Sequence, residues 1–127
     1  METVKTMNTK QDNSGPFQVD TSNFSLEVLK SNLPVLTAFA TQWSRPCQVL
    51  ASVLDEMASS CSGILKIAWV NVDENPDLGQ WYNIQAVPTL LYFIAGNVRC
   101  RIVGTATKSA ILTKLERITC IDENIGE

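Results

Sequence analysis

The feature that most constrains this chain is an apolar run, Pro34 to Ala40, followed after a short polar turn by a helical pattern from Pro46 to Met57. Turn signals bound the apolar run, as is typical of a strand that is buried on both faces. The helical spacing directs one set of apolar side chains toward a core, namely Val49, Leu50, Val53, Leu54 and Met57. A strand, a tight turn and a helix form the junction at which an α/β protein usually places its chemistry. The turn itself, residues 43–47, is therefore the candidate site.

The 127 residues predict one compact domain. Residues 1–16 are polar, hold no periodicity and are predicted to form a flexible arm, and residues 122–127 are predicted to form a polar tail. The domain between them, residues 17–121, has the predicted order β-α-β-α-β-α-β-β-α. Its predicted strands are Phe17–Val19, Pro34–Ala40, Ile64–Val72, Thr89–Ala95 and Val98–Val103, with Gly96-Asn97 as a hairpin turn. Helix crossovers favour parallel pairing of the early strands and the hairpin favours antiparallel pairing, so we expect a mixed sheet with helices on both faces.

Three motifs resemble the thioredoxin family. Trp43-Ser44-Arg45-Pro46-Cys47 resembles its active-site motif Trp-Cys-Gly-Pro-Cys, Val87-Pro88-Thr89 resembles its cis-proline loop, and residues 70–76 resemble its third strand and the turn that follows. The resemblance runs from about Phe17 to Ile121. It implies an α/β, thioredoxin-like fold with a central mixed β-sheet of about five strands and helices on both faces. It also implies membership of a family of thiol–disulfide oxidoreductases.

The candidate site departs from the family pattern at the first cysteine of the motif, where this chain has Ser44. A dithiol oxidoreductase attacks with a thiolate at a helix N-terminus and resolves the mixed disulfide with a second thiol. By position, Ser44 replaces the attacking cysteine and Cys47 matches the resolving one. The family's buried aspartate, the lysine that faces it and an aromatic residue correspond here to Ala38, Trp69 and Ala40. These grouped changes favour natural divergence over an engineered knockout, and they imply that dithiol reductase chemistry is lost or severely weakened.

Two interpretations of the turn stay open on the sequence. In the structural one, Ser44 is a helix N-cap that accepts from the backbone N–H of Cys47, with Pro46 in the first helical turn. In the enzymatic one, Cys47 acts alone as a monothiol in thiol–disulfide exchange. Arg45 then supplies a nearby positive charge that favours the thiolate, although Arg45 can equally be a solvated surface residue. Shielding of Cys47 would disfavour the thiolate.

The resemblance also implies a partner-binding groove beside Pro88. In the family, a cis bond before this proline leaves the preceding backbone free to pair with an extended partner segment; a trans proline at a strand start is the alternative. The predicted contact residues are Trp43, Arg45, Pro46, Val87, Pro88 and Gly104. Core packing is the alternative role for Trp43. The sequence thus predicts a protein that binds a partner protein or peptide in this groove, with a monothiol enzyme or an inert structural subunit as alternatives.

Composition excludes several other function classes. The net charge is −3 and lysine and arginine form no runs, so we expect neither nucleic acid nor a membrane surface as a partner. The chain has no histidine, and its four cysteines, at positions 47, 61, 100 and 120, fit no zinc pattern, so no metal or cofactor is expected. With no export signal at the N-terminus, reduced thiols in the cytoplasm are expected, and the three cysteines outside the motif are predicted to be packing residues. The oligomeric state and the partner's identity are not predicted.

Overall fold

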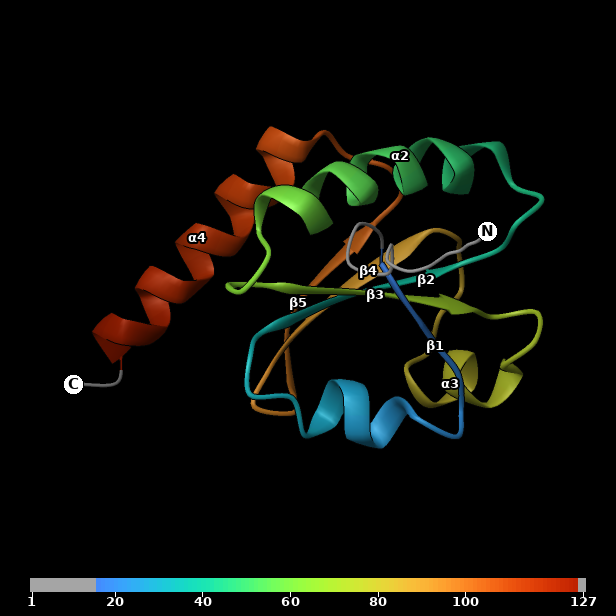
Figure 1. The fold of residues 1–127 in the computed structure, drawn as a ribbon, viewed down its shortest axis with the longest axis horizontal. Coiled ribbons are helices and arrows are strands. Elements are labelled where there is room, and N and C mark those ends of the chain that lie inside the picture. The colour runs from blue at the N-terminus through green and yellow to red at the C-terminus, as the bar shows by residue number, and fades with distance from the viewer. Residues whose placement is uncertain (1–15, 126–127) are drawn as a thin grey trace, which may run out of the picture.

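The structure of the chain is a computed structural model, which describes the backbone of residues 16–125 and the side-chain surroundings of residues 16–118. The predicted arm, apart from Pro16, the last two residues and the side chain of Cys120 lie outside this description. Figure 1 shows the elements, and they follow the predicted order. Along the chain they are β1 (Phe17–Val19), η1 (Ser25–Leu29), β2 (Val35–Ala40), α2 (Arg45–Ser60), β3 (Lys66–Asn71), α3 (Pro76–Trp81), β4 (Thr89–Ile94), β5 (Asn97–Val103) and α4 (Lys108–Ile125).

The five strands form one mixed sheet in the order β1-β3-β2-β4-β5. Strand β3 pairs in parallel with both β1 and β2, while β4 pairs antiparallel with β2 and β5. This confirms the predicted mixed sheet with its terminal hairpin. Every residue of β2 is buried, as a central strand that is covered on both faces should be.

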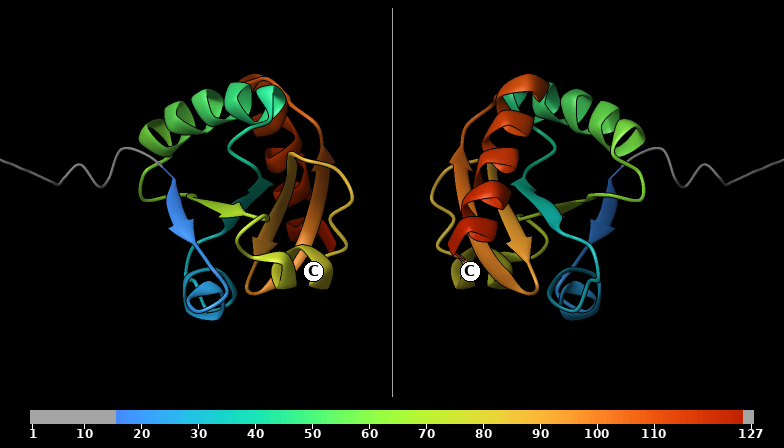
Figure 2. Two further views of the ribbon diagram at one scale, coloured as in Figure 1. Left: turned by 90° about the vertical axis from the view of Figure 1, so that its right-hand side faces the viewer. Right: turned by 90° about the vertical axis from the view of Figure 1, so that its left-hand side faces the viewer.

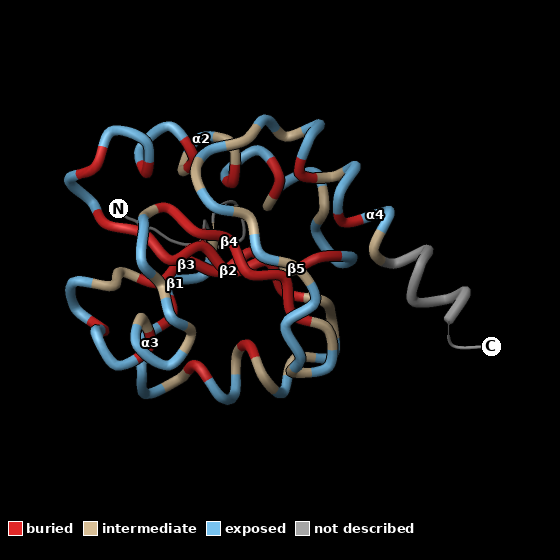
Figure 3. The backbone as a smooth tube through the Cα atoms, turned by 180° about the vertical axis from the view of Figure 1, so that it is seen from behind, coloured by how far each residue is buried: buried red, intermediate tan, exposed pale blue. Residues whose placement is uncertain are grey.

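Helices cover both faces of the sheet (Figures 1 and 2), with α2 and α4 on one face and η1 and α3 on the other. The first face carries a buried core that includes Leu36, Ala38 and Trp69 from the sheet and Leu50 and Leu54 from α2. The opposite core gathers side chains from the alternate strand positions, among them Val35, Phe39, Val70, Leu91 and Phe93. Figure 3 shows the result, with the buried backbone concentrated in the strands between two partly exposed layers.

The β4–β5 hairpin turns one residue earlier than predicted. Ile94 pairs with Asn97, so the two turn residues are Ala95 and Gly96, with φ of 51° and 82°. Positive φ at both positions is the signature of the type I′ turn, whose twist matches that of the strands. A side chain at Gly96 would place its Cβ 3.0 Å from the carbonyl oxygen of Leu29, which explains why glycine sits here.

Three helices also differ from the prediction. Helix α2 ends at Ser60, close to the C-terminal stop that Ser62-Gly63 indicates in the sequence, but Val49 does not face the core as predicted. It is 51% exposed because the buried stripe passes through Cys47, Leu50, Leu54 and Met57 instead. The first helix, which the sequence predicts from a cap at Asp20, Thr21 or Ser22 through about Lys30, shortens to η1. There the backbone N–H of Lys30 bonds to the carbonyl of Ser25, five residues back. Helix α4 continues to Ile125, so residues 122–125 of the predicted tail are helical.

Candidate functional site

The turn that precedes α2 is built around Ser44. Its backbone is extended, with φ −82° and ψ 129°, and its Oγ accepts a hydrogen bond from the backbone N–H of Cys47 at 3.4 Å. Its carbonyl accepts from the backbone N–H of Gln48 at 3.0 Å, and Pro46 lies in the first turn, where no N–H is needed. The N-cap predicted for Ser44 is therefore present.

Cys47 lies directly beneath this cap and is fully buried, with 0% of its surface exposed. Its Sγ accepts from the backbone N–H of Thr41 at 3.4 Å and lies 3.9 Å from the Thr41 hydroxyl. Ser44 above it is 8% exposed. Sequence reasoning missed Thr41, because nothing in its local pattern shows that β2 ends beside the sulfur of the next helix.

Trp43 projects from the turn and is 72% exposed, so its alternative role in core packing is wrong. Its indole Nε1 donates to Oδ2 of Asp73 at 2.9 Å, which ties the turn to the loop after β3. Arg45 and Pro46 beside it are also exposed. The turn thus presents an aromatic ring and a cation to solvent while its sulfur points inward.

The loop before β4 supplies the remaining predicted contact residues. The Val87–Pro88 peptide bond is cis. Pro88 is buried, and its carbonyl accepts from the backbone N–H of Gly104 at 2.8 Å. Gly104 has a φ of 91°, which favours glycine, and no atom lies within 4 Å of the Cβ that a larger residue would carry there. Val87 is half-buried and packs against the core that contains Cys47. Because Phe39 near the end of β2 pairs with Thr89 at the start of β4, this loop and the turn lie at the same end of the sheet.

Comparison with known proteins identifies the family. The thioredoxin family model matches residues 15–117. The chain is 39% identical to thioredoxin 1 of Nostoc sp. over 104 residues, which cover 82% of this chain and 97% of that relative. It is also 39% identical to the thioredoxin of Pseudomonas aeruginosa over 98 residues, 77% of this chain and 91% of that protein. The chain belongs to the thioredoxin family.

The buried side chains behind the turn are apolar, which differs from the thioredoxin pattern. Ala38 pairs with Trp69 across β2 and β3 and with Leu90 across β2 and β4. Ala38 and Leu90 are 0% exposed and Trp69 is 9% exposed, and all belong to the same core as Cys47. The methyl group of Ala38 cannot accept a proton, and the Trp69 ring carries no charge. The structure thus shows hydrocarbon packing at the positions where the family pattern has an aspartate and a lysine.

A cavity of about 400 Å³ lies beside this candidate site. Its lining comes from the end of β3, from α3 and from the loop before β4: Val72, Pro76, Gly79, Gln80, Asn83, Ile84, Gln85, Ala86 and Val87. Of the predicted contact residues, Val87 alone lies on its wall. Sequence reasoning missed this cavity because it forms between segments that come together only in the fold.

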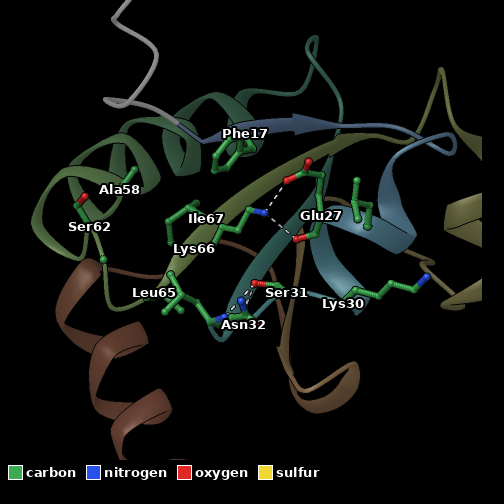
Figure 4. Close-up of a pocket in the computed structure, with 13 residues that line it drawn as sticks. Phe17, Glu27, Lys30, Ser31, Asn32, Ala58, Ser62, Leu65, Lys66 and Ile67 are labelled. Carbon is green, nitrogen blue, oxygen red and sulfur yellow. Dashed lines mark hydrogen bonds and ion pairs between the residues drawn. The ribbon is translucent and has the colours of Figure 1, made fainter.

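A second cavity, of about 570 Å³, lies at the opposite end of the sheet, where β2 and β3 begin (Figure 4). The half-buried cation on its wall, Lys66, is already paired. Nζ of Lys66 contacts the Glu27 carboxylate at 2.6 Å and the Glu27 carbonyl at 2.8 Å, and lies 4.7 Å from the centre of the Phe17 ring. These contacts hold η1 against β3, so we interpret the pair as structural.

Two further observations concern only the residues that the structure describes. They include no group of three or more side chains that could hold a metal ion. None of their helices is both long and apolar enough to cross a lipid bilayer.

Proposed function

We propose that this thioredoxin-family protein has lost dithiol reductase chemistry and acts by binding a partner protein at the surface formed by the Trp43 turn and the loop before β4. One observation carries the proposal. A hydroxyl caps α2 where the family has its attacking thiol, and the remaining sulfur of the motif, on Cys47, is completely buried.

The chemistry of the turn supports the loss of the first redox step. A serine alkoxide forms at neutral pH only beside a strong base, and the chain has no histidine. The Ser44 hydroxyl is also engaged with the backbone N–H of Cys47. The burial of Cys47 argues against the monothiol alternative, because a substrate disulfide must reach the sulfur for exchange to occur.

Exposed side chains and free backbone groups on this surface support the proposal that it binds a partner. Trp43, Arg45 and Pro46 are exposed and, by the pairing of β2 with β4, lie at the same end of the sheet as Val87. Within residues 16–118, no hydrogen bond engages the backbone N–H or C=O of Val87. An extended segment of a partner can use such free backbone groups for pairing, with side-chain contacts adding specificity. Exposed aromatic residues and arginine are common anchors in protein interfaces.

We also propose a reducing compartment such as the cytoplasm. The three cysteines whose surroundings are described, Cys47, Cys61 and Cys100, are free thiols. Free thiols are the usual state of cysteine in reducing compartments.

The decisive experiment compares the parent chain with Ser44→Cys in a dithiothreitol-coupled insulin reduction assay. We expect turnover near background for the parent and partial rescue by Ser44→Cys, because a thiol at the helix N-terminus is activated by the dipole and by Arg45. Resolution by Cys47 should stay slow, so mass spectrometry should detect trapped mixed disulfides. A double variant that combines Ser44→Cys with Ala38→Asp is compared once its fold is verified. The new aspartate supplies a proton acceptor for Cys47 and should increase turnover further.

Parent turnover comparable to that of an ordinary thioredoxin would refute the loss of activity. Titration with a disulfide reagent on native protein, compared with Cys47→Ala, isolates the reactivity of Cys47. A fast reaction that disappears in Cys47→Ala would favour the monothiol enzyme over the binding protein. If Ser44→Cys gives no gain at all, the surface is closed to substrates and the binding proposal is also wrong.

A further inference from the structure

The cavity of about 400 Å³ beside Val87 is open to a partner segment that lies along the proposed surface. Val87 belongs to both, so the cavity continues the surface toward α3. Its apolar wall includes Val72, Ile84 and Val87, and its polar groups are the amides of Gln80, Asn83 and Gln85. None of its lining residues is charged. Such a cavity can pack an aliphatic stem and hydrogen-bond a polar end group.

The loop that forms this cavity is firmly held. The backbone N–H of Ile84 bonds to the carbonyl of Gly79 at 2.8 Å, and Asn83 adopts a φ of 54°, which together close the C-terminal end of α3. Arg101, from β5, donates to the carbonyl of Tyr82 at 2.7 Å. The cavity is thus formed before any partner arrives, which lowers the entropic cost of binding.

The charge around the cavity is predominantly negative. Asp73 and Glu74 lie between the lining residues Val72 and Pro76, and Asp77 lies between the lining residues Pro76 and Gly79. All three carboxylates are on exposed residues, and Trp43 engages one oxygen of Asp73. Arg101 from β5 donates to the backbone carbonyls of Tyr82 and Asn83 in this loop and offsets one of the three negative charges.

We infer that the cavity receives a lysine or arginine side chain of the partner segment. The stem packs on the apolar wall, the cationic end meets the amide oxygens, and the surrounding carboxylates favour its charge. This inference rests on the proposed function and names the partner's chemistry: an extended segment that carries a basic residue near its contact with Val87.

The test uses Ser44→Cys as a covalent trap for short peptides. Each peptide has one cysteine, activated as a mixed disulfide with thionitrobenzoate, with lysine, alanine or glutamate on both sides of it. The introduced thiolate attacks the peptide's cysteine sulfur, a protein–peptide disulfide forms, and thionitrobenzoate leaves with the electron pair of the broken S–S bond. Its absorbance gives the capture rate, which is divided by the rate of the same peptide with glutathione.

We expect lysine peptides to be captured about 5–10-fold faster than glutamate peptides at low salt, with the difference shrinking as salt rises. Gly79→Leu should reduce this preference by filling the cavity, while Gly79→Ala should not, since its Cβ would lie at an ordinary 3.8 Å from Cγ1 of Val72. Glu74→Gln with Asp77→Asn should also reduce the preference. Asp55→Asn with Glu56→Gln, on the exposed side of α2, is the matched control.

The outcomes separate this inference from the proposed function. Equal capture of lysine and glutamate peptides, or a lysine preference that survives both sets of changes, overturns the inference and leaves partner binding intact. If all peptides react no faster than they do with glutathione, the proposed binding surface fails and the inference fails with it. Circular dichroism verifies the fold of Gly79→Leu, and the charge-neutralised variant decides the question if that protein does not fold.

Discussion

The cores on the two faces of the sheet are built from different kinds of side chains. On the α2–α4 face, Ala38, Trp69 and Cys47 occupy the region behind the turn, and the sulfur of Cys47 accepts from Thr41. On the η1–α3 face, four aromatic rings meet with centroids 5.5–6.4 Å apart: Phe24, Phe39, Tyr82 and Phe93. Yet this second face also holds the Thr37 hydroxyl, which is buried and has no hydrogen-bond partner.

The difference is informative about the site. A buried polar atom without a partner lowers stability, and a buried charge lowers it more. The face that carries the site has apolar residues where the family pattern has a buried aspartate and lysine, so no desolvation cost of that kind remains there. On the other face, the buried Thr37 hydroxyl without a partner still costs desolvation free energy. The replacements behind the turn therefore favour stability over proton transfer.

Restoring the acid behind the turn should have the largest effect. Ala38→Asp buries a carboxyl among Trp69 and Leu90, which should cost about 3 kcal/mol or more of unfolding free energy at pH 7. Burial should raise the folded-state pKa of that carboxyl above its unfolded value of about 4, so the native state binds more protons. The destabilisation should therefore grow as pH rises from about 4 toward the folded pKa.

Urea unfolding at several pH values measures this effect, with Ala38→Asn as the uncharged control. The control should lose stability equally at every pH. The parent, which has no histidine, should be nearly flat between about pH 6 and 8. If Ala38→Asp loses the same unfolding free energy at every pH, the new aspartate is solvated or paired. The apolar character of the α2–α4 face would then not explain why a charge is unfavourable there.

Removing the unpartnered hydroxyl on the opposite face should have a smaller effect of opposite sign. Thr37→Val keeps the shape of the side chain and removes an unsatisfied buried group, so it should stabilise the protein by about 1 kcal/mol. Thr89→Val is the matched control, because the Thr89 hydroxyl donates to the carbonyl of Ala86 at 2.7 Å. That variant should lose stability in the same denaturation experiment. Loss of stability in both variants would mean that Thr37 has a partner after all.

Removing the Tyr82 hydroxyl from the aromatic cluster should have a modest effect on stability at alkaline pH. Burial raises the pKa of Tyr82 above its ordinary value. The folded state therefore holds the phenol proton more tightly than the unfolded chain, and stability should fall as pH rises above about 10. Tyr82→Phe should lose less stability than the parent between pH 9 and pH 11, as measured by thermal unfolding. An identical alkaline loss in both proteins would place the responsible group elsewhere.

The smallest effect is expected at the turn before η1. Hydrogen bonding to the Ser22 hydroxyl lowers the pKa of Asp20, with desolvation opposing it and the backbone N–H groups of Ser22 and Asn23 adding to the reduction. A lowered folded-state pKa contributes stability above the unfolded pKa and loses it as pH falls through the folded value. Asp20→Asn should therefore flatten the acid side of the stability profile below about pH 4. An unchanged acid limb would show that this turn does not contribute.

Most of the fold was predictable because the strongest signals in the chain are short-range. The apolar run that became β2 and the cap at Ser44 need only neighbouring residues to be recognised. The errors also have local causes. The hairpin turn lies one residue earlier than predicted because Ala95 adopts a left-handed conformation, which alanine rarely does. Val49 was wrongly assigned to the core because it lies only one position along the helix from the buried Leu50.

The sequence by itself determined that a serine, Ser44, stands at the first position of the turn and that Ser44 and Pro46 start a helix, since these depend on residue identity and spacing. Only the tertiary structure decided whether the turn's groups are accessible. Cys47 is buried because α2 packs on the sheet, and Trp43 is exposed while bonded to Asp73, thirty positions along the chain. The cavity beside Val87 arises in the same way, between β3, α3 and the loop before β4. Accessibility is a property of long-range packing, and no local pattern in a single sequence encodes which distant segments will meet.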